Sequence, residues 1–261
     1  MGRRHRASEK RERPDGARER RFVQPHVDKS THRYAPSFFE GRGFLNETHP
    51  KVEELVDDIR GKLEPGDHAK LYEAGYFARG PVLEIGRLHG RSTVVLAMGI
   101  RDGRGDGHLT SIEYDDRYLP WARRHLKSHR LLKRVTLLQG DSSTIVRGLD
   151  ATFDTVFVDG DHSYDGVIAD IGALEGRIAP TGVIMFHDYF HPLNETGEYG
   201  VRRAVDERKD DLGLEYRGRF GGIALFERVA NRRARANPRM AARQVAHDDP
   251  GGREGGPRRS V

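Results

Sequence analysis

The sequence of 261 residues contains no cysteine and only one tryptophan. The absence of cysteine excludes a disulfide framework, a thiolate metal site and a thiol nucleophile. The longest apolar runs, such as residues 94–100, are far shorter than the roughly 18 residues that a membrane-spanning helix needs. No apolar segment follows the N-terminal arginines, which argues against a secretory signal. We therefore expect a cytoplasmic protein that does not enter a membrane.

Basic residues are concentrated at the two ends of the chain. Residues 1–33 hold 11 Lys and Arg against 5 Asp and Glu, and residues 228–261 hold 9 against 3. Because the net charge of the whole chain is only +5, the part between these ends is acidic. Few large apolar residues accompany the arginines, so we expect disordered basic tails at 1–33 and 230–261. Nucleic-acid binding by these tails is the alternative, although aromatic residues that would stack on bases are nearly absent there.

Residues 34–77 have the pattern of a helical lead-in or cap to a following domain. Apolar residues recur at helical spacing over 51–63, directly after a proline that suits the start of a helix. A second helix is predicted over 67–78, with Asp67 as its N-cap.

Short apolar strands then alternate with helices, which predicts an α/β domain over 78–229. The strands are predicted at 81–86, 108–115, 135–141, 154–161, 182–188 and 222–228. The helices between them are predicted at 92–100, 117–126, 166–178 and 201–213. Such alternation is typical of a parallel sheet with helices on both faces.

A glycine-containing turn joins the first of these strands to the next helix. It carries Glu84, Gly86, Gly90 and Ser92, and it matches neither the dinucleotide fingerprint nor a P-loop. Glycines at a turn between a strand and a helix allow a ligand to approach the backbone, although a tight structural turn would have the same sequence.

Acidic residues follow the second and third strands. Glu113 lies 23 residues beyond Gly90, close to the spacing of an acid that binds ribose hydroxyls. Asp141 and Ser142 follow the third strand, where they could contact an adenine edge. Asp141 is an equally good N-cap for the next helix, and both readings stay open.

Together these segments resemble the class I S-adenosylmethionine (SAM)-dependent methyltransferases. The stretches 153–171 and 180–190 are similar to the small-molecule branch of O-methyltransferases, the macrocin and sugar type. The resemblance covers about residues 68–229. It implies a Rossmann-like α/β fold, with a seven-stranded, mostly parallel sheet, helices on both faces and an antiparallel last strand. It also implies that SAM lies across the C-terminal strand ends, with Glu84, Gly86, Gly90, Ser92, Glu113, Asp141 and Ser142 as its binding residues.

The resemblance further implies a polar cluster after the fourth and fifth strands, which are neighbours in the family's sheet. In the resembled enzymes a divalent metal binds acids there and orients the acceptor hydroxyl, which makes Asp159 and Asp188 ligands. His187 stands where related enzymes often have a second acid, so we add it to the predicted ligands. Mg²⁺ or Mn²⁺ is then the expected metal, and histidine favours Mn²⁺ or Fe²⁺. A metal-free site, in which these acids only anchor turns, stays open.

Methyl transfer to a hydroxyl group also needs a group that takes the proton. Asp161 is the first candidate base and His162 the second. Alternatively, Asp161 caps the following helix and His162 is a solvated residue at the start of that helix.

The sequence therefore predicts O-methylation of a small hydroxylated molecule, a sugar or secondary metabolite. One alternative is a nucleic-acid methyltransferase that uses the basic tails, and another is a cofactor-binding or scaffold protein without catalysis. The acidic middle of the chain argues against the first, and the set of acids argues against the second. A homo-oligomer stays open.

Overall fold

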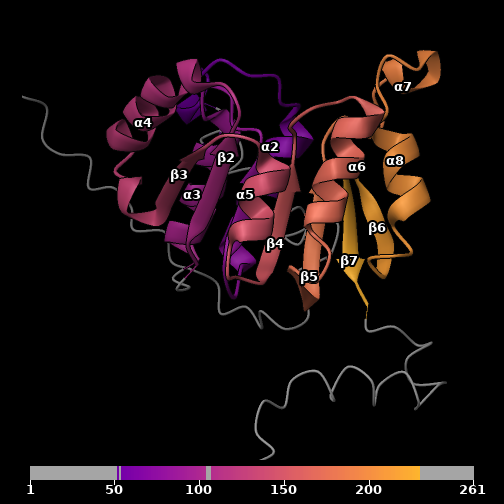
Figure 1. Cartoon of the computed structure of the whole chain (residues 1–261). Helices are drawn as coiled ribbons and strands as arrows, with labels where there is room; N and C mark the ends of the chain where they lie inside the picture. Colours follow the sequence, from indigo (N-terminus) through magenta and orange to yellow (C-terminus); the bar gives the residue numbers. More distant parts are fainter. Residues whose placement is uncertain (1–51, 53, 104–106, 230–261) are drawn as a thin grey trace, which may run out of the picture.

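The computed structural model describes residues 52, 54–103 and 107–229 (Figure 1). The basic tails predicted at 1–33 and 230–261, and the lead-in up to residue 51, lie outside the described residues.

A seven-stranded sheet forms the centre of the structure, in the order β3-β2-β1-β4-β5-β7-β6. The first five strands along the sequence pair in parallel, and β7 is antiparallel to both β5 and β6. This confirms the predicted mostly parallel sheet with an antiparallel last strand. The strands are β1 (Val82–Ile85), β2 (Leu109–Glu113), β3 (Val135–Gln139), β4 (Phe153–Val158), β5 (Ile178–Phe186), β6 (Leu214–Phe220) and β7 (Ile223–Arg228).

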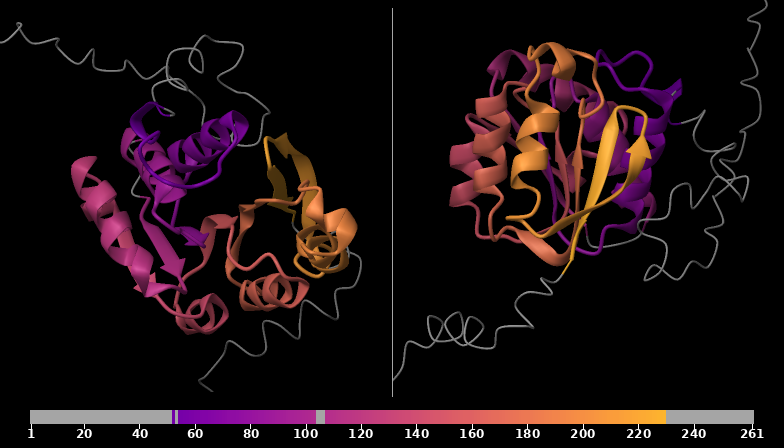
Figure 2. Two further views of the ribbon diagram at one scale, coloured as in Figure 1. Left: turned by 90° about the horizontal axis from the view of Figure 1, so that it is seen from above. Right: turned by 90° about the vertical axis from the view of Figure 1, so that its right-hand side faces the viewer.

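Helices cover both faces of the sheet, as expected (Figure 2). Side chains of α2, α3 and α4 pack on one face, and those of α5, α6 and α8 on the other. The helices are α2 (Pro65–Phe77), α3 (Arg91–Asp102), α4 (Leu119–Ser128), α5 (Ser142–Gly148), α6 (Tyr164–Ala173), α7 (Leu193–Thr196) and α8 (Val201–Arg208), with 3-10 turns at Asp116–Tyr118 and Leu132–Arg134. None of the helices in the described part of the chain has the length and apolar character needed to cross a membrane.

Alternation along the central strands produces two hydrophobic cores, because successive side chains of a strand point to opposite faces. In β5, Val183 and Met185 join the core under α2 and α3, whereas Ile184 and Phe186 join the core under α6 and α8. Burial on both faces explains why these strands are almost continuously apolar.

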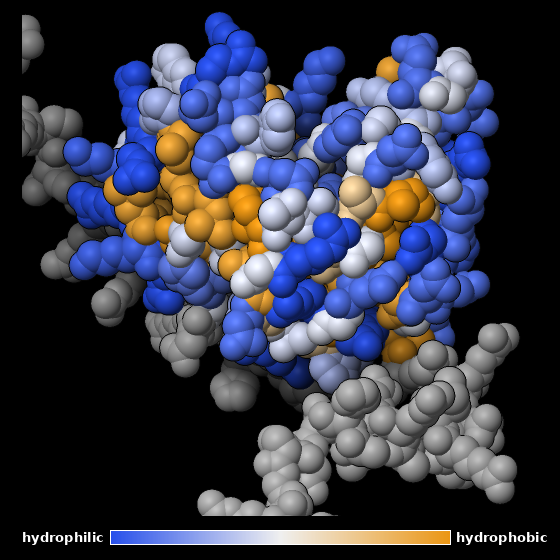
Figure 3. Space-filling view, viewed as in Figure 1, coloured by the Kyte–Doolittle hydropathy of each residue, from blue (hydrophilic) through white to orange (hydrophobic). Residues whose placement is uncertain are grey.

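The edge strand β3 is less covered than the centre of the sheet. On the face drawn in Figure 3, an apolar area lies around this edge, where Leu138, Ile145 and Leu149 are half-buried. Most of the remaining surface on this face is hydrophilic (Figure 3).

The helix predicted over 51–63 is wrong in its extent. Val52, Glu54 and Leu55 are helical, and the chain then forms a turn and an irregular segment up to residue 64. Val56 and Ile59 are fully buried, as their spacing predicted, but Leu55 is 48% exposed. Gly61, with φ of 151°, does not continue a helix.

Candidate active site

A cavity of about 1330 Å³ opens at the C-terminal ends of the parallel strands. Open α/β sheets generally bind ligands at this edge. Most of the predicted site residues line it: Gly86, Ser92, Glu113, Asp141, Ser142, Asp159, Asp161, His162, His187 and Asp188. Glu84 and Gly90, also predicted to contact the cofactor, are not among the lining residues.

Glu84 is fully buried behind the cavity wall, which corrects its predicted direct contact with a cofactor. Its carboxylate accepts hydrogen bonds from the hydroxyls of Ser92 (2.6 Å), Thr93 (2.6 Å) and Ser111 (2.5 Å). Burial raises the pKa of Glu84, and the three hydroxyl donors act in the opposite direction. The side chain therefore ties β1 to β2 and to the start of α3.

The two glycines of the turn are required by packing within the protein. At Gly86, with φ of 83°, a Cβ atom would lie 1.9 Å from the backbone oxygen of Asp159. At Gly90, with φ of 91°, a Cβ atom would lie 3.1 Å from Ala122 in α4. Gly90 thus allows α3 and α4 to approach, which is the structural alternative to ligand contact.

Glu113 lies directly over this turn. Its Oε2 accepts hydrogen bonds from the backbone N–H groups of Arg87 (3.1 Å) and Leu88 (2.8 Å), and its Oε1 accepts one from Asp115 (3.0 Å). Three backbone donors hold the carboxylate at the cavity wall, and further acceptor capacity remains on its oxygens.

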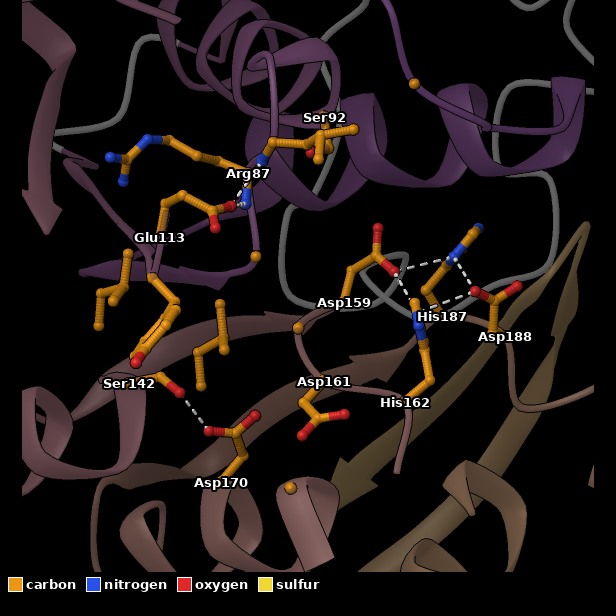
Figure 4. A pocket seen from close by; sticks show the side chains of 18 of the residues that line it. Arg87, Ser92, Glu113, Ser142, Asp159, Asp161, His162, Asp170, His187 and Asp188 are labelled. Atoms are coloured by element: carbon orange, nitrogen blue, oxygen red, sulfur yellow. Dashed lines mark hydrogen bonds and ion pairs between the residues drawn. The ribbon is translucent and has the colours of Figure 1, made fainter. Parts of the chain in front are cut away.

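Arg87 is a residue of this wall that the sequence analysis did not single out. Its guanidinium is 2% exposed and donates to the carbonyls of Ser111 (3.0 Å) and Leu138 (2.7 Å) and to the side chain of Gln139 (3.2 Å). In Figure 4 it lies beside Glu113, away from the other labelled acids. A buried cation at this place links the ends of β1, β2 and β3.

The end of β3 carries a second polar group. Asp141 caps α5 by accepting from the backbone N–H of Thr144 (2.7 Å), and it still lines the cavity. The hydroxyl of Ser142 donates to Asp170 at 2.5 Å. Asp170, which the sequence analysis did not predict, is 3% exposed, and burial raises its pKa to about 6.

Two aspartates and two histidines meet after β4 and β5, and we call Asp159, His162, His187 and Asp188 the acid–histidine cluster (Figure 4). Nε2 of His162 lies 3.4 Å from Oδ1 of Asp159 and 3.0 Å from Oδ2 of Asp188. Nδ1 of His187 lies 3.1 and 3.3 Å from the same two oxygens. The backbone of Asp188 has φ of 55°, a conformation that aspartate tolerates better than most residues.

Both imidazoles of this cluster are held by carboxylates. Hydrogen bonds to Asp159 and Asp188 raise the pKa of His162 to about 9. Burial disfavours the charged form of His187, but its carboxylate partners outweigh burial and raise its pKa to about 12. Burial likewise favours the neutral form of Asp188, but the two imidazoles hold its pKa well below the usual range. These contacts favour the protonated form of His162 in the metal-free protein, whereas a role as base or as metal ligand requires the neutral imidazole.

His187 is also bound from behind. Its Nε2 lies 3.2 Å from Oδ2 of Asp67. Asp67 is fully buried and accepts hydrogen bonds from the backbone N–H groups of Glu64 (2.7 Å), Gly222 (2.9 Å) and Ile223 (3.2 Å). Asp67 was predicted as an N-cap, but the cap of α2 is Glu64 and Asp67 is the third residue of the helix, within its first turn.

The structure also places a triad other than the predicted one within reach of a single metal ion. Ligand atoms of Asp159, His162 and Asp188 all lie within 4.8 Å of one another. Nδ1 of His187, which was predicted as a ligand, faces the same two carboxylates, but His187 is only 7% exposed and its Nε2 faces Asp67. Two carboxylates and one imidazole form a mixed donor set that suits Mn²⁺ or Fe²⁺ better than Mg²⁺.

Asp161, the first candidate base, points toward the start of α6. Its carboxylate accepts from the backbone N–H of Ser163 at 2.8 Å and from the hydroxyl of Ser163 at 2.9 Å. It lines the cavity between the acid–histidine cluster and Asp170 (Figure 4).

An aromatic stack forms the remaining wall. The ring of Tyr199 lies between those of His162 (centroids 4.6 Å apart, 10° between planes) and His191 (4.7 Å, 27°). Sequence analysis missed Tyr199, because only the fold brings the connection before α8 over the end of β4.

Residues 83–189 match the model of a protein family described as a methyltransferase domain. The search of curated proteins found no match.

Several solved structures have the same fold as this chain. Cofactor-bound Rv0187 from MTB is 23% identical, with a TM-score of 0.56 over 75% of this chain and 94% of that one. The O-methyltransferase TomG from Streptomyces achromogenes, involved in tomaymycin synthesis and crystallised with SAM, is 22% identical, with a TM-score of 0.54 over 70% and 89%. An O-methyltransferase from Bacillus cereus, in complex with SAH, is 21% identical, with a TM-score of 0.54 over 69% and 89%. The predicted class I methyltransferase fold is confirmed.

Elements outside the matched residues also contribute to the site. Asp67 of α2 and Gly222 of the β6–β7 turn both contact the buried side of His187. The cavity wall next to the acid–histidine cluster therefore depends on segments before and after residues 83–189.

Proposed function

We propose that this chain transfers the methyl group of SAM to a hydroxyl group of a small molecule. One observation carries the proposal: a single cavity joins the glycine turn and Glu113 to the acid–histidine cluster. Its volume of about 1330 Å³ exceeds that of most single-ligand pockets, so it suits a cofactor and a small acceptor together.

The cofactor is assigned to the end of the cavity formed by β1, β2 and β3. Backbone donors fix Glu113 there with acceptor capacity to spare, which suits two ribose hydroxyls. Asp141, Ser142 and Asp170 supply polar groups beyond it, on the side where an adenine would lie. Structures of the same fold that were solved with SAM and with SAH support this assignment.

The acceptor is assigned to the end formed by β4 and β5. A divalent metal, Mg²⁺ or Mn²⁺, bound by Asp159, His162 and Asp188 would lower the pKa of an acceptor hydroxyl. Asp161 would take the proton, because its carboxylate faces the cavity and is not bound to an imidazole. The contribution of the chain to the transfer itself is alignment of the hydroxyl oxygen with the methyl group.

The test is transfer of a labelled methyl group from SAM to a panel of sugars, phenols and other hydroxylated small molecules, followed by mass spectrometry of the products. Asp161→Asn should lower the rate by about 10²–10⁴, the usual contribution of a positioned base, and leave SAH affinity unchanged. Asp165→Asn, an exposed acid in the first turn of α6, is the matched control. Methylation of RNA or DNA with none of the small molecules would overturn the proposal in favour of a nucleic-acid acceptor.

A further inference from the structure

Residues 59–64, which we call the arch, cross the rim of the cavity between the start of α3 and the start of α2. At one end, the side chain of Ile59 is fully buried and its carbonyl accepts a hydrogen bond from Nη1 of Arg91 at 2.9 Å. At the other end, the backbone N–H of Glu64 donates to Asp67 at 2.7 Å. Both ends of the arch are therefore fixed to the helices that frame the site.

A chain of side chains connects these two ends. Nε of Arg91 donates to Nε2 of His68 at 3.0 Å, and Nδ1 of His68 lies 3.1 Å from the carbonyl of Glu64. The middle of the arch lies directly on Arg91, since a Cβ atom at Gly61 would be 3.3 Å from the Cβ of that residue. The arch is thus a positioned element, although it has no regular secondary structure.

Arg60 and Lys62 are the two cations of the arch, and both line the cavity with exposed side chains. Neither has a hydrogen bond or ion pair with any residue that the structure describes. The carboxylates deeper in the cavity differ, because each has a partner within the protein: Glu113, Asp141, Asp159, Asp161, Asp170 and Asp188. Two positive charges at the cavity rim are thus left available for a ligand.

We propose that Arg60 and Lys62 form an anion-binding site for a carboxylate or phosphate group on a molecule that occupies the cavity. Guanidinium and ammonium groups bind such anions through charge-assisted hydrogen bonds. The anion has two sources: the carboxylate of the methionine half of the cofactor, or an acidic group on the acceptor. Both sources rest on the proposed function, whereas binding of an anion by Arg60 and Lys62 can be tested without it.

The test compares the full chain with the double variant Arg60→Gln/Lys62→Gln. Arg123→Gln/Lys127→Gln is the matched control, because it removes the same charge from exposed positions of α4 that do not line the cavity. Calorimetry gives the affinity of each protein for SAH, for 5′-methylthioadenosine, which lacks the amino-acid group, and for inorganic phosphate with and without saturating SAH. Thermal unfolding checks that both variants are folded.

If the cofactor supplies the anion, SAH should bind the double variant about tenfold more weakly than the control variant, and 5′-methylthioadenosine should bind the two variants equally. An anion supplied by the acceptor predicts equal SAH affinity and about tenfold weaker phosphate binding to the SAH-saturated double variant. Equal affinities of both variants for all three ligands would overturn the site. If the unaltered chain binds neither SAH nor 5′-methylthioadenosine, the proposed function fails, and the phosphate measurement without SAH still decides the anion site.

Discussion

Asp67 and His187 lie 120 residues apart in the sequence, yet their side chains meet, with Oδ2 and Nε2 separated by 3.2 Å. The same carboxylate accepts backbone hydrogen bonds from the β6–β7 turn at Gly222 and Ile223. One buried acid therefore joins α2, the end of β5 and the β6–β7 turn, and it fixes the imidazole that contacts Asp159 and Asp188.

Replacement of this acid should destabilise the fold. Asp67→Asn puts an amide N–H₂ where the carboxylate now accepts from Glu64 and His187, so we expect the free energy of unfolding to fall by about 2–4 kcal/mol. Urea denaturation measures the change. Asp57→Asn, at an exposed position, is the control and should change stability by less than about 0.5 kcal/mol. Equal stabilities of the two variants would contradict the role of Asp67 in linking these elements.

Asp170 gives a prediction for the pH dependence of stability. Burial raises its folded pKa from 3.8 to about 6, so the folded state binds this proton more tightly than the unfolded state. The contribution of Asp170 to the free energy of unfolding is therefore fully favourable below about pH 4. It is lost as the pH rises through about 6.

Asp170→Asn removes the buried charge and should be more stable than the unaltered chain at pH 8, by about 1–3 kcal/mol. At pH 4.5 this advantage should largely disappear. Urea denaturation at both pH values measures it, with the exposed Asp150→Asn as control. The same stability difference at both pH values would show that the Asp170 carboxyl does not titrate near pH 6.

The metal triad can be tested without knowledge of the acceptor. We expect Mn²⁺ to bind the full chain, and His162→Ala and Asp188→Asn each to weaken its binding by at least about tenfold, because each removes one of three ligands. Electron paramagnetic resonance of free Mn²⁺ measures the affinity. His108→Ala is the control, because His108 lies just before the start of β2, at the end of the strand away from the cavity. It should bind Mn²⁺ as the unaltered chain does. Undiminished binding to both ligand variants would remove the metal from this triad.

The strands at the centre of the sheet could be predicted because a strand that is buried on both faces is almost continuously apolar in sequence. β1, β4 and the second half of β5 are short, mostly apolar runs, and the acids that follow β4 and β5 indicated the ligand-binding edge. β6 was missed because it is an edge strand in which most side chains are exposed or half-buried, so its Leu214–Phe220 segment has no apolar pattern. The helix predicted over 51–63 was wrong beyond Leu55, where the Ile59 carbonyl accepts from Arg91 and Gly61 has a φ of 151°.

The sequence could not predict those parts of the site that depend on contacts between distant segments. The family's strand order placed the residues after the fourth and fifth strands near one another but did not show that His187 contacts Asp67. Nor did it show that Glu84 faces three hydroxyls behind the wall. These partners depend on strand order and on α2, which local patterns do not specify.

The central claim is that the cavity end at Glu113 binds the ribose of SAM, and SAH titrations of the full chain and of Glu113→Gln test it most directly. We predict that SAH binds the unaltered chain and that the folded variant binds about 10- to 100-fold more weakly, the scale of lost hydrogen bonds to a charged group. Glu215→Gln, an exposed acid on β6, should bind as the unaltered chain does. No SAH binding by the unaltered chain, or equal affinity of a folded Glu113→Gln, would contradict the account.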